Sequence, residues 1–282
     1  MGVGVACLSV NDALAKHLVD RYSPLQILFL RNIIALPAAI LLTLLIGGPK
    51  ALRSARPAAH LLRGALWIGA TLLFFTSFRY MPLAEATALI FVAPLFITAL
   101  SALLLHERVG RRRWVAVLVG FLGVLVIIRP GLDAFQPVSL LPVMTAFVYA
   151  LLMLSAKWVD PRESVWTMLL YLTGASALLS ALLVPLVWVP LTLEDLWSFV
   201  AIALFGTAGM TMMTQAFRLA PAAIVAPLDY SGLVWASLLG WLIWQEVPDA
   251  IAAAGAVLII GSGLFIIWRE TGRRRTGDGF VQ

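Results

Sequence analysis

Residues 78–90 read FRYMPLAEATALI, and residues 217–229 read FRLAPAAIVAPLD. Both stretches contain the pattern Phe-Arg-x-x-Pro-x-Ala, and they begin 139 residues apart. The same offset pairs Glu107 with Glu246, each near the end of an apolar run. A repeat at about half the chain length indicates two similar halves. We place these halves at residues 1–137 and 138–282, the second with a short basic C-terminal tail.

The composition predicts an integral membrane protein. Of the 282 residues, 62% are hydrophobic and 12% are charged, whereas soluble proteins carry about 45–50% apolar and about 25% charged residues. A bilayer core about 30 Å thick requires roughly 20 apolar residues in a helix. Continuous apolar runs favour helices over the alternating strands of a barrel. We predict ten such spans, at residues 2–19, 24–46, 59–78, 84–105, 114–128, 139–158, 165–189, 196–217, 222–244 and 251–268.

The basic residues predict the orientation of these spans. With the N-terminus in the cytoplasm, the inner segments hold fifteen Lys and Arg residues and the outer segments hold three, as the positive-inside rule requires. Both termini are therefore expected to be cytoplasmic. A half with five crossings ends on the side opposite to its start, so the two halves are oppositely oriented in the membrane. The predicted fold is all-α, with ten transmembrane helices in two inverted five-helix repeats.

Several classes of function are excluded by the residues available. The single cysteine, Cys7, allows neither a disulfide framework nor a cysteine zinc site. The three histidines do not stand at metal-ligand spacing, and no phosphate-binding GxxxxGK[ST] motif occurs. The predicted loops are too short for a soluble catalytic domain. We therefore expect no enzymatic activity, no cofactor, no metal and no nucleic-acid partner. We expect the protein to be surrounded by a lipid bilayer.

The helix pattern, the two Phe-Arg-x-x-Pro-x-Ala turns and the glutamates Glu107 and Glu246 resemble the drug/metabolite transporter superfamily, EamA type. Within it, NDALAK at residues 11–16 and FLRN at residues 29–32 resemble the branch that holds S-adenosylmethionine uptake carriers and YddG-type aromatic amino acid exporters. We expect the YddG type. The resemblance implies a basket of ten helices around a central cavity, and alternating access without ATP hydrolysis. It also implies a multi-pass protein of the bacterial inner membrane.

Charged residues within the spans mark the candidate site, because charges in hydrocarbon are costly and persist mainly where they pair or face a wet cavity. Asp12 and Arg31 lie at matched depth on neighbouring helices, which predicts a structural ion pair. Alternatively, one of them meets the ammonium or carboxylate of a zwitterionic substrate. Lys16, one turn from Asp12, is a competing partner. Asp229 follows Pro227, which loosens the helix locally because proline has no backbone N–H. The freed backbone groups and the Asp229 carboxylate would together suit an ammonium group or a proton.

Aromatic and polar side chains complete the predicted cavity. Aromatic rings would stack on an aromatic or amphipathic solute, although such rings also anchor helices at membrane interfaces or fill cores. The candidate substrate-binding residues are Asn11, Asp12, Phe74, Phe78, Tyr80, Tyr149, Thr211, Gln215, Asp229 and Tyr230.

The sequence therefore predicts a monomeric secondary transporter that exports small amphipathic metabolites, with aromatic or neutral amino acids as the expected substrates. Asp12, Glu85 and Asp229 are candidates for proton coupling, and facilitated diffusion is an equal alternative. A second interpretation is uptake of S-adenosylmethionine or another cationic metabolite. A third is a membrane scaffold that transports nothing.

Overall fold

The computed structural model describes residues 1–104, 111–128, 136–155, 163–219 and 226–277, and within these ranges every regular element is helical. The α-helices are α1 (Gly2–Leu18), α2 (Pro24–Leu42), α3 (Pro57–Ser77), α4 (Leu83–Ile90), α5 (Ala93–Leu104), α6 (Arg111–Ile128), α7 (Leu140–Leu154), α8 (Val165–Leu183), α9 (Leu193–Leu219), α11 (Ser231–Trp244) and α12 (Ala250–Gly277). Short 3-10 or π turns extend several of them, namely η1 (Thr43–Gly47), η2 (Pro49–Leu52), η3 (Pro137–Ser139), η5 (Val184–Val187) and η6 (Ala226–Tyr230). The predicted all-helical class is confirmed.

Six of the described helical segments are long and apolar enough to cross a membrane. They are Pro24–Gly47, Pro57–Ser77, Leu83–Leu104, Pro137–Leu154, Trp166–Val187 and Leu193–Met213, and shorter apolar helices cover Trp114–Ile128 and Ala250–Phe265. The chain is therefore a multi-pass membrane protein. Following the predicted topology, we call the end with the α1–α2 connection outer and the opposite end inner. Glu107, which the repeat pairs with Glu246, lies outside the described residues.

The predicted fourth span is not one continuous helix. It is divided at Phe91 and Val92 into α4 and α5, and Pro94, which lacks a backbone N–H, takes the second position of α5, where proline is well tolerated. In the ninth span the 3-10 turn η6 leads directly into α11. The division of the fourth span meets the end of η6, since the rings of Phe91 and Tyr230 pack edge to face with centroids 5.1 Å apart.

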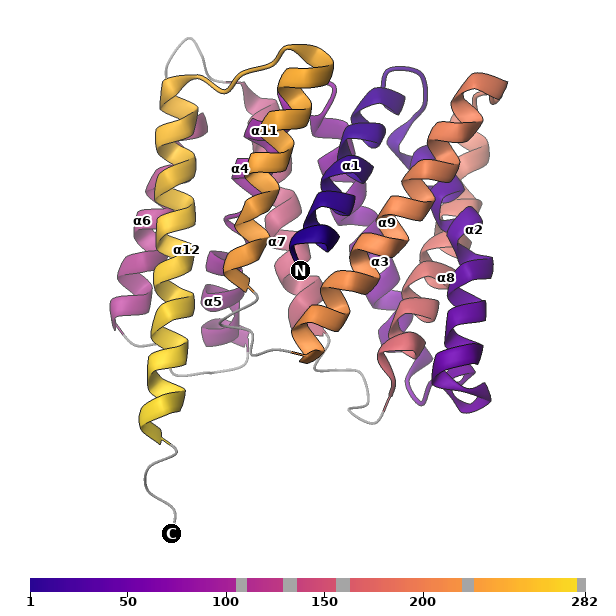
Figure 1. Ribbon diagram of the computed structural model, residues 1–282, viewed down its shortest axis with the longest axis horizontal. Coiled ribbons are helices and arrows are strands. Elements are labelled where there is room, and N and C mark those ends of the chain that lie inside the picture. The colour runs from indigo at the N-terminus through magenta and orange to yellow at the C-terminus, as the bar shows by residue number, and fades with distance from the viewer. Residues whose placement is uncertain (105–110, 129–135, 156–162, 220–225, 278–282) are drawn as a thin grey trace.

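Helices of the first half pack mainly against helices of the second half. α1 packs against α9 and α11, and its counterpart α7 packs against α3 and against α5. α6 packs along α12 at one end of the molecule, and α2 packs along α8 at the other (Figure 1). Each of these contacts joins the two halves. The contacts of α1 with the second half correspond to those of α7 with the first half, as expected for two related repeats that interlock.

The approach of α6 to α12 depends on two glycines. A Cβ atom added to Gly123 would lie 2.8 Å from the carbonyl oxygen of Gly255, and one added to Gly255 would lie 2.8 Å from the carbonyl oxygen of Gly123. Small residues allow helix backbones to approach closely in a membrane, where packing drives helix association. This glycine contact therefore sets the spacing of the two helices.

A buried carboxylate holds the inner ends of both halves together. Glu163, which precedes α8, accepts hydrogen bonds from the Ser54 hydroxyl at 2.7 Å and from the Ala55 N–H at 2.8 Å. Its other oxygen lies 2.7 Å from Nε2 of His60, near the start of α3. The side chains of Glu163 and His60 are only 7% and 1% exposed. This cluster therefore ties the α7–α8 connection to the α2–α3 connection.

The stability of the protein should depend on the ionisation of Glu163. Burial raises the pKa of this carboxyl, but hydrogen bonds from Ser54, His60 and the Ala55 N–H outweigh burial and bring the pKa below its ordinary value of 4.5. A lowered pKa stabilises the folded state above pH 4.5, and this contribution is lost as the pH falls through the folded-state pKa. Thermal unfolding measured between about pH 3 and pH 6 should show a weaker pH dependence in Glu163→Gln than in the wild type.

The control for this experiment is Glu194→Gln, which neutralises an exposed carboxylate in the first turn of α9. We expect the control to follow the wild-type pH profile. Identical profiles for the wild type and Glu163→Gln would show that the cluster contributes nothing to stability.

Candidate substrate site

A cavity of about 180 Å³ lies between the two halves. Six helices contribute to its wall: α1, α2, α3 and α4 from the first half, and α7 and α9 from the second. It is lined by Leu8, Asn11, Asp12, Arg31, Trp67, Ala70, Thr71, Phe74, Phe75, Ile90, Thr145, Tyr149, Gly206, Met210 and Met213. Two groups of opposite charge, Asp12 and Arg31, thus share one cavity.

The carboxylate side of the cavity is formed by two neighbouring residues of α1. Nδ2 of Asn11 donates a hydrogen bond of 2.9 Å to Oδ1 of Asp12, which assigns the amide orientation. Oδ1 of Asn11 is buried and has no hydrogen-bond partner among the described residues. Gly206 provides the space for it, because a Cβ atom there would lie 2.6 Å from that oxygen. The unpartnered amide oxygen and the carboxylate together offer hydrogen-bond acceptors to a cation.

Arg31 lies on α2, and its guanidinium stacks on Trp67 with the central carbon 5.5 Å from the ring centroid. Among the described residues, the side chains of Asp12 and Arg31 do not approach within ion-pair distance, although the two charges attract each other. The physical reason is that the Asp12 carboxylate has a partner in Asn11 and Arg31 has one in Trp67. The guanidinium donors therefore remain free to bind an anionic group.

Aromatic rings and methionines form the rest of the wall. Trp67, Phe74 and Tyr149 line the cavity together with Met210 and Met213. Aromatic faces attract rings and cations, and methionine side chains adapt to irregular shapes. The wall is therefore suited to an apolar or aromatic group attached to a charged head group.

Four of the residues predicted for the site line this cavity: Asn11, Asp12, Phe74 and Tyr149. Phe78 does not; it is 3% exposed and packs in the core against Phe74 and Phe75, with centroid distances of 4.6 and 5.7 Å. Tyr80 is 58% exposed and lines a separate polar cavity of about 230 Å³ at the outer end.

Thr211, Asp229 and Tyr230 are not among the residues that line the central cavity. The Thr211 hydroxyl donates to the carbonyl oxygen of Thr207 at 2.7 Å, and Thr211 borders an apolar groove between α2 and α9. Asp229 and Tyr230 belong to η6, and the Tyr230 hydroxyl faces Gly263 of α12. The side chain of Gln215 lies outside the part of the chain that the structure describes.

The sequence prediction missed several cavity residues that a helical pattern could have revealed. Trp67 and Thr71 precede the predicted residue Phe74 at helical spacings along α3, so they share its face. Gly206, Met210 and Met213 have the same spacing along α9. In each set, polar or polarisable side chains lie on a helix face that points into the protein. Such a pattern indicates the wall of a cavity.

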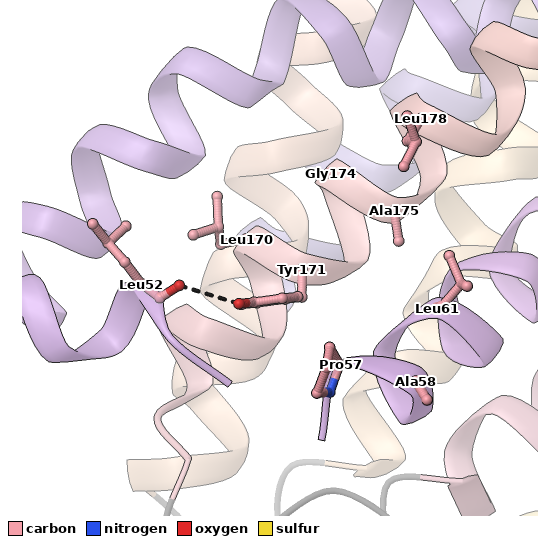
Figure 2. Close-up of a pocket in the computed structure, with 9 residues that line it drawn as sticks. All are labelled: Leu52, Pro57, Ala58, Leu61, Leu170, Tyr171, Gly174, Ala175 and Leu178. Carbon is pink, nitrogen blue, oxygen red and sulfur yellow. Dashed lines mark hydrogen bonds between the residues drawn. The ribbon is translucent and has the colours of Figure 1, made fainter. Parts of the chain in front are cut away.

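A larger cavity of about 480 Å³ opens between α3 and α8 (Figure 2). Its lining is apolar except for Tyr171, whose hydroxyl donates to the carbonyl oxygen of Leu52 at 3.2 Å. No charged side chain lines it. The central cavity, with both charges, is therefore the stronger candidate for a polar solute. Within the described ranges, no three His, Cys, Asp or Glu residues are grouped as a metal site would require.

Proteins of known sequence that resemble this chain are named as transporters. An S-adenosylmethionine uptake transporter of Rickettsia prowazekii (strain Madrid E) is 31% identical over 272 residues, which are 93% of this chain and 89% of the relative. A riboflavin transporter of Vibrio cholerae is 34% identical over 82% of this chain and 78% of the relative. A pseudopaline exporter of Pseudomonas aeruginosa is 30% identical over 89% of each chain. These names do not support the predicted likeness to YddG-type aromatic amino acid exporters.

The fold and the family agree with these relatives. A solved crystal structure matches with a TM-score of 0.61 over 96% of both chains, at 22% sequence identity, which shows a shared fold. The model of the EamA-like transporter family matches residues 2–129 and again residues 137–268. The family model thus matches the sequence twice, and the two matches together cover most of the chain. The chain belongs to the EamA-like transporter family.

Proposed function

We propose that this chain carries a small metabolite with an α-amino acid head group across the bacterial inner membrane, by alternating access of the cavity that Asp12 and Arg31 share. The observation that carries the proposal is that both charged residues line one cavity without an ion-pair contact between them among the described residues. An ion pair would have neutralised both groups internally. A cavity that keeps them apart offers an anionic and a cationic subsite to one ligand.

The head group fits the two subsites by charge. The ammonium of an α-amino acid would be bound by the Asp12 carboxylate and the unpartnered Oδ1 of Asn11. Its carboxylate would be bound by the guanidinium of Arg31, whose planar donors suit two oxygen acceptors. A solute that lacks either charge would leave the opposite protein charge unpaired in the membrane, which is costly.

The side group of the substrate is expected to be aromatic or apolar, since it would pack against Trp67, Phe74 and Tyr149. The cavity volume of about 180 Å³ lies below the roughly 300–1,000 Å³ of sites for drug-sized ligands. This size favours a single amino acid. Export of an aromatic or neutral amino acid is therefore our first candidate.

Uptake of S-adenosylmethionine is the second candidate, and the relative from Rickettsia prowazekii favours it. S-adenosylmethionine also carries an α-amino acid group, and its adenine ring would pack on the same aromatic wall if the cavity widened beyond its volume of about 180 Å³. Riboflavin has no α-amino acid group, so the name of the Vibrio cholerae relative is the least compatible with the charges of this cavity.

The topology that we propose for transport has ten helices in two inverted five-helix halves, at residues 1–137 and 138–282, with both termini cytoplasmic. Inverted repeats allow the two halves to exchange conformations and expose one site alternately to each side. The contact between Phe91 and Tyr230 joins the fourth and ninth spans of the two halves and is a suitable hinge. We propose a monomer. Proton coupling through Asp12, Glu85 or Asp229 would be excluded if transport into proteoliposomes ignored an imposed pH gradient.

Equilibrium binding to the purified protein tests the substrate class. We expect tryptophan and S-adenosylmethionine to bind in competition with each other, and riboflavin to compete with neither. The tighter of the two amino acid ligands distinguishes the first candidate from the second. Binding of riboflavin without binding of either amino acid compound would contradict the proposal.

A further inference from the structure

Lys16 and Glu246 form an ion pair near the outer end of the molecule. Nζ of Lys16 lies 2.7 Å from Oε1 and 2.5 Å from Oε2 of Glu246, and the Lys16 side chain is only 7% exposed. Lys16 belongs to α1, in the first half, and Glu246 follows α11, in the second half. The pair therefore joins the two halves through a buried lysine and a partly buried glutamate, whose side chain is 28% exposed.

Further contacts attach a third element to this pair. Nζ of Lys16 also donates to the carbonyl oxygen of Met81 at 3.4 Å, and Oε2 of Glu246 accepts from the N–H of Leu83 at 3.3 Å. Nζ of Lys16 lies 4.9 Å from the centre of the Trp244 ring, at the end of α11. One pair of side chains thus connects α1, the turn between α3 and α4, and the end of α11.

The backbone fixes the direction of Glu246. Gln245 takes the left-handed conformation with φ 58°, and the N–H of Glu246 donates to the carbonyl oxygen of Gly240 at 3.1 Å. Left-handed backbone is uncommon for residues other than glycine. The last turn of α11 therefore presents the carboxylate to Lys16 from a defined position.

The pair lies on the outer side of the substrate cavity. Along α1, the cavity residues Leu8, Asn11 and Asp12 all precede Lys16, which is one helical turn further out. Along α4, the cavity residue Ile90 lies inward of Leu83. The outer end around the pair is packed, since Leu18, Phe78 and Leu83 are 1%, 3% and 0% exposed. The ion pair and these buried side chains thus lie outward of the cavity residues.

We propose that the ion pair of Lys16 and Glu246 is the lock that closes the outer side of the substrate cavity, and that it must break in each transport cycle. The proposal rests on the proposed transport function. Attraction within a buried pair is largely offset by the loss of hydration of both groups. Such a pair can open when water enters, whereas an apolar contact at the same place would favour permanent closure. Lys16 and Glu246 are thus positioning residues, which act on access to the cavity and not on the bound solute.

The test measures access to the cavity from the outer side. In a Cys7→Ser background, Thr71→Cys places one thiol in the cavity wall. Spheroplasts are treated with a membrane-impermeant maleimide, and the labelling rate is measured. The double variant Lys16→Gln with Glu246→Gln removes both charges and should be labelled about tenfold faster than the parent. The exchanged pair, Lys16→Glu with Glu246→Lys, restores the attraction and should return to within about threefold of the parent rate.

Arg21→Gln is the matched control. Arg21 also forms an ion pair between the halves at the outer end, with Oδ2 of Asp195 at 3.1 Å, but its side chain is 61% exposed. Exposed pairs contribute little, so labelling should stay at the parent rate. If the double variant is not recovered in folded form, Glu246→Asp, which keeps the charge and shortens the reach, should raise the rate about threefold.

Two results would overturn the proposal. One is that the folded double variant is labelled no faster than the parent. If only Glu246→Asp folds, the same result in that variant would count. The other is an increase that the exchanged pair does not reduce, because this would assign the effect to lost packing. Labelling requires no transported solute. Absence of flux in the wild type would therefore contradict the proposed function, whereas unchanged labelling in a protein that transports would contradict the lock alone.

Discussion

Arg31→Gln is expected to reduce the transport of tryptophan, or of another α-amino acid that the wild type carries, by about 100-fold. The substitution removes the cation that we assign to the substrate carboxylate, in the cavity that also holds the anionic subsite of Asp12. Loss of one partner from a buried charged contact costs about 2–5 kcal/mol, and each 1.4 kcal/mol corresponds to a factor of about ten. Initial rates of uptake into proteoliposomes measure the effect.

Substrate analogues separate recognition from damage to the fold. Tryptamine lacks the carboxylate of tryptophan, so Arg31→Gln should not reduce its already weak transport further. Indole-3-propionate lacks the ammonium of tryptophan, so Asp12→Asn should not reduce its already weak transport further. Arg63→Gln is the control, because Arg63 is another buried arginine but bonds to the carbonyl oxygen of Leu152 at 3.0 Å, away from the cavity. Equal losses for tryptophan and tryptamine in Arg31→Gln would argue against carboxylate binding.

Gly255→Leu is expected to destabilise the protein by about 3 kcal/mol or more, and to lower the Tm by roughly 10 °C. Its Cβ atom alone would lie 2.8 Å from the carbonyl oxygen of Gly123, so α6 and α12 would have to separate. Overpacking against a backbone atom cannot be relieved by a change of rotamer. Thermal unfolding of the purified protein in detergent measures the loss.

Gly261→Leu provides the comparison within the same helix. A Cβ atom at Gly261 meets nothing within 4 Å, and both substitutions raise the helix propensity of α12 equally. We expect Gly261→Leu to stay within about 0.5 kcal/mol of the wild type. If both variants unfolded at the same temperature, the close contact of α6 and α12 would not contribute to stability.

The helical membrane fold could be predicted because its signals are repeated and strong. Apolar runs of the length of a bilayer recur throughout the chain, and the repeat of residues 78–90 in residues 217–229 is visible without an alignment. The family model matches twice, at residues 2–129 and at residues 137–268. The depth of Asp12 and Arg31 could also be counted along their helices, which placed both in one cavity.

The pairing of charges could not be predicted from depth alone. Depth brings Asp12 and Arg31 to the same level, but the direction of each side chain decides its partner, and these directions depend on Asn11 and Trp67. Lys16 was a candidate partner for Asp12 through helical spacing. Its partner is Glu246, 230 positions away in the sequence. A single sequence contains no signal for such a contact.

The same limit applies to the aromatic residues and the helix interruptions. Phe74 and Phe78 lie one turn apart, yet only Phe74 lines the cavity, because Phe78 packs in the core. The fourth span was predicted as one continuous helix, but it is divided at Phe91 and Val92, where the Phe91 ring packs against Tyr230. Composition does not encode which side of a ring meets a cavity.

Counterflow in proteoliposomes tests the carrier mechanism most directly. Liposomes that contain the purified protein are loaded with unlabelled tryptophan or S-adenosylmethionine and diluted into a trace of the labelled compound. A carrier with one alternating site should accumulate the label transiently above its equilibrium level, and Arg31→Gln should abolish the accumulation. Simple equilibration of the label without an overshoot, or no entry of either compound, would contradict an alternating cavity for α-amino acids.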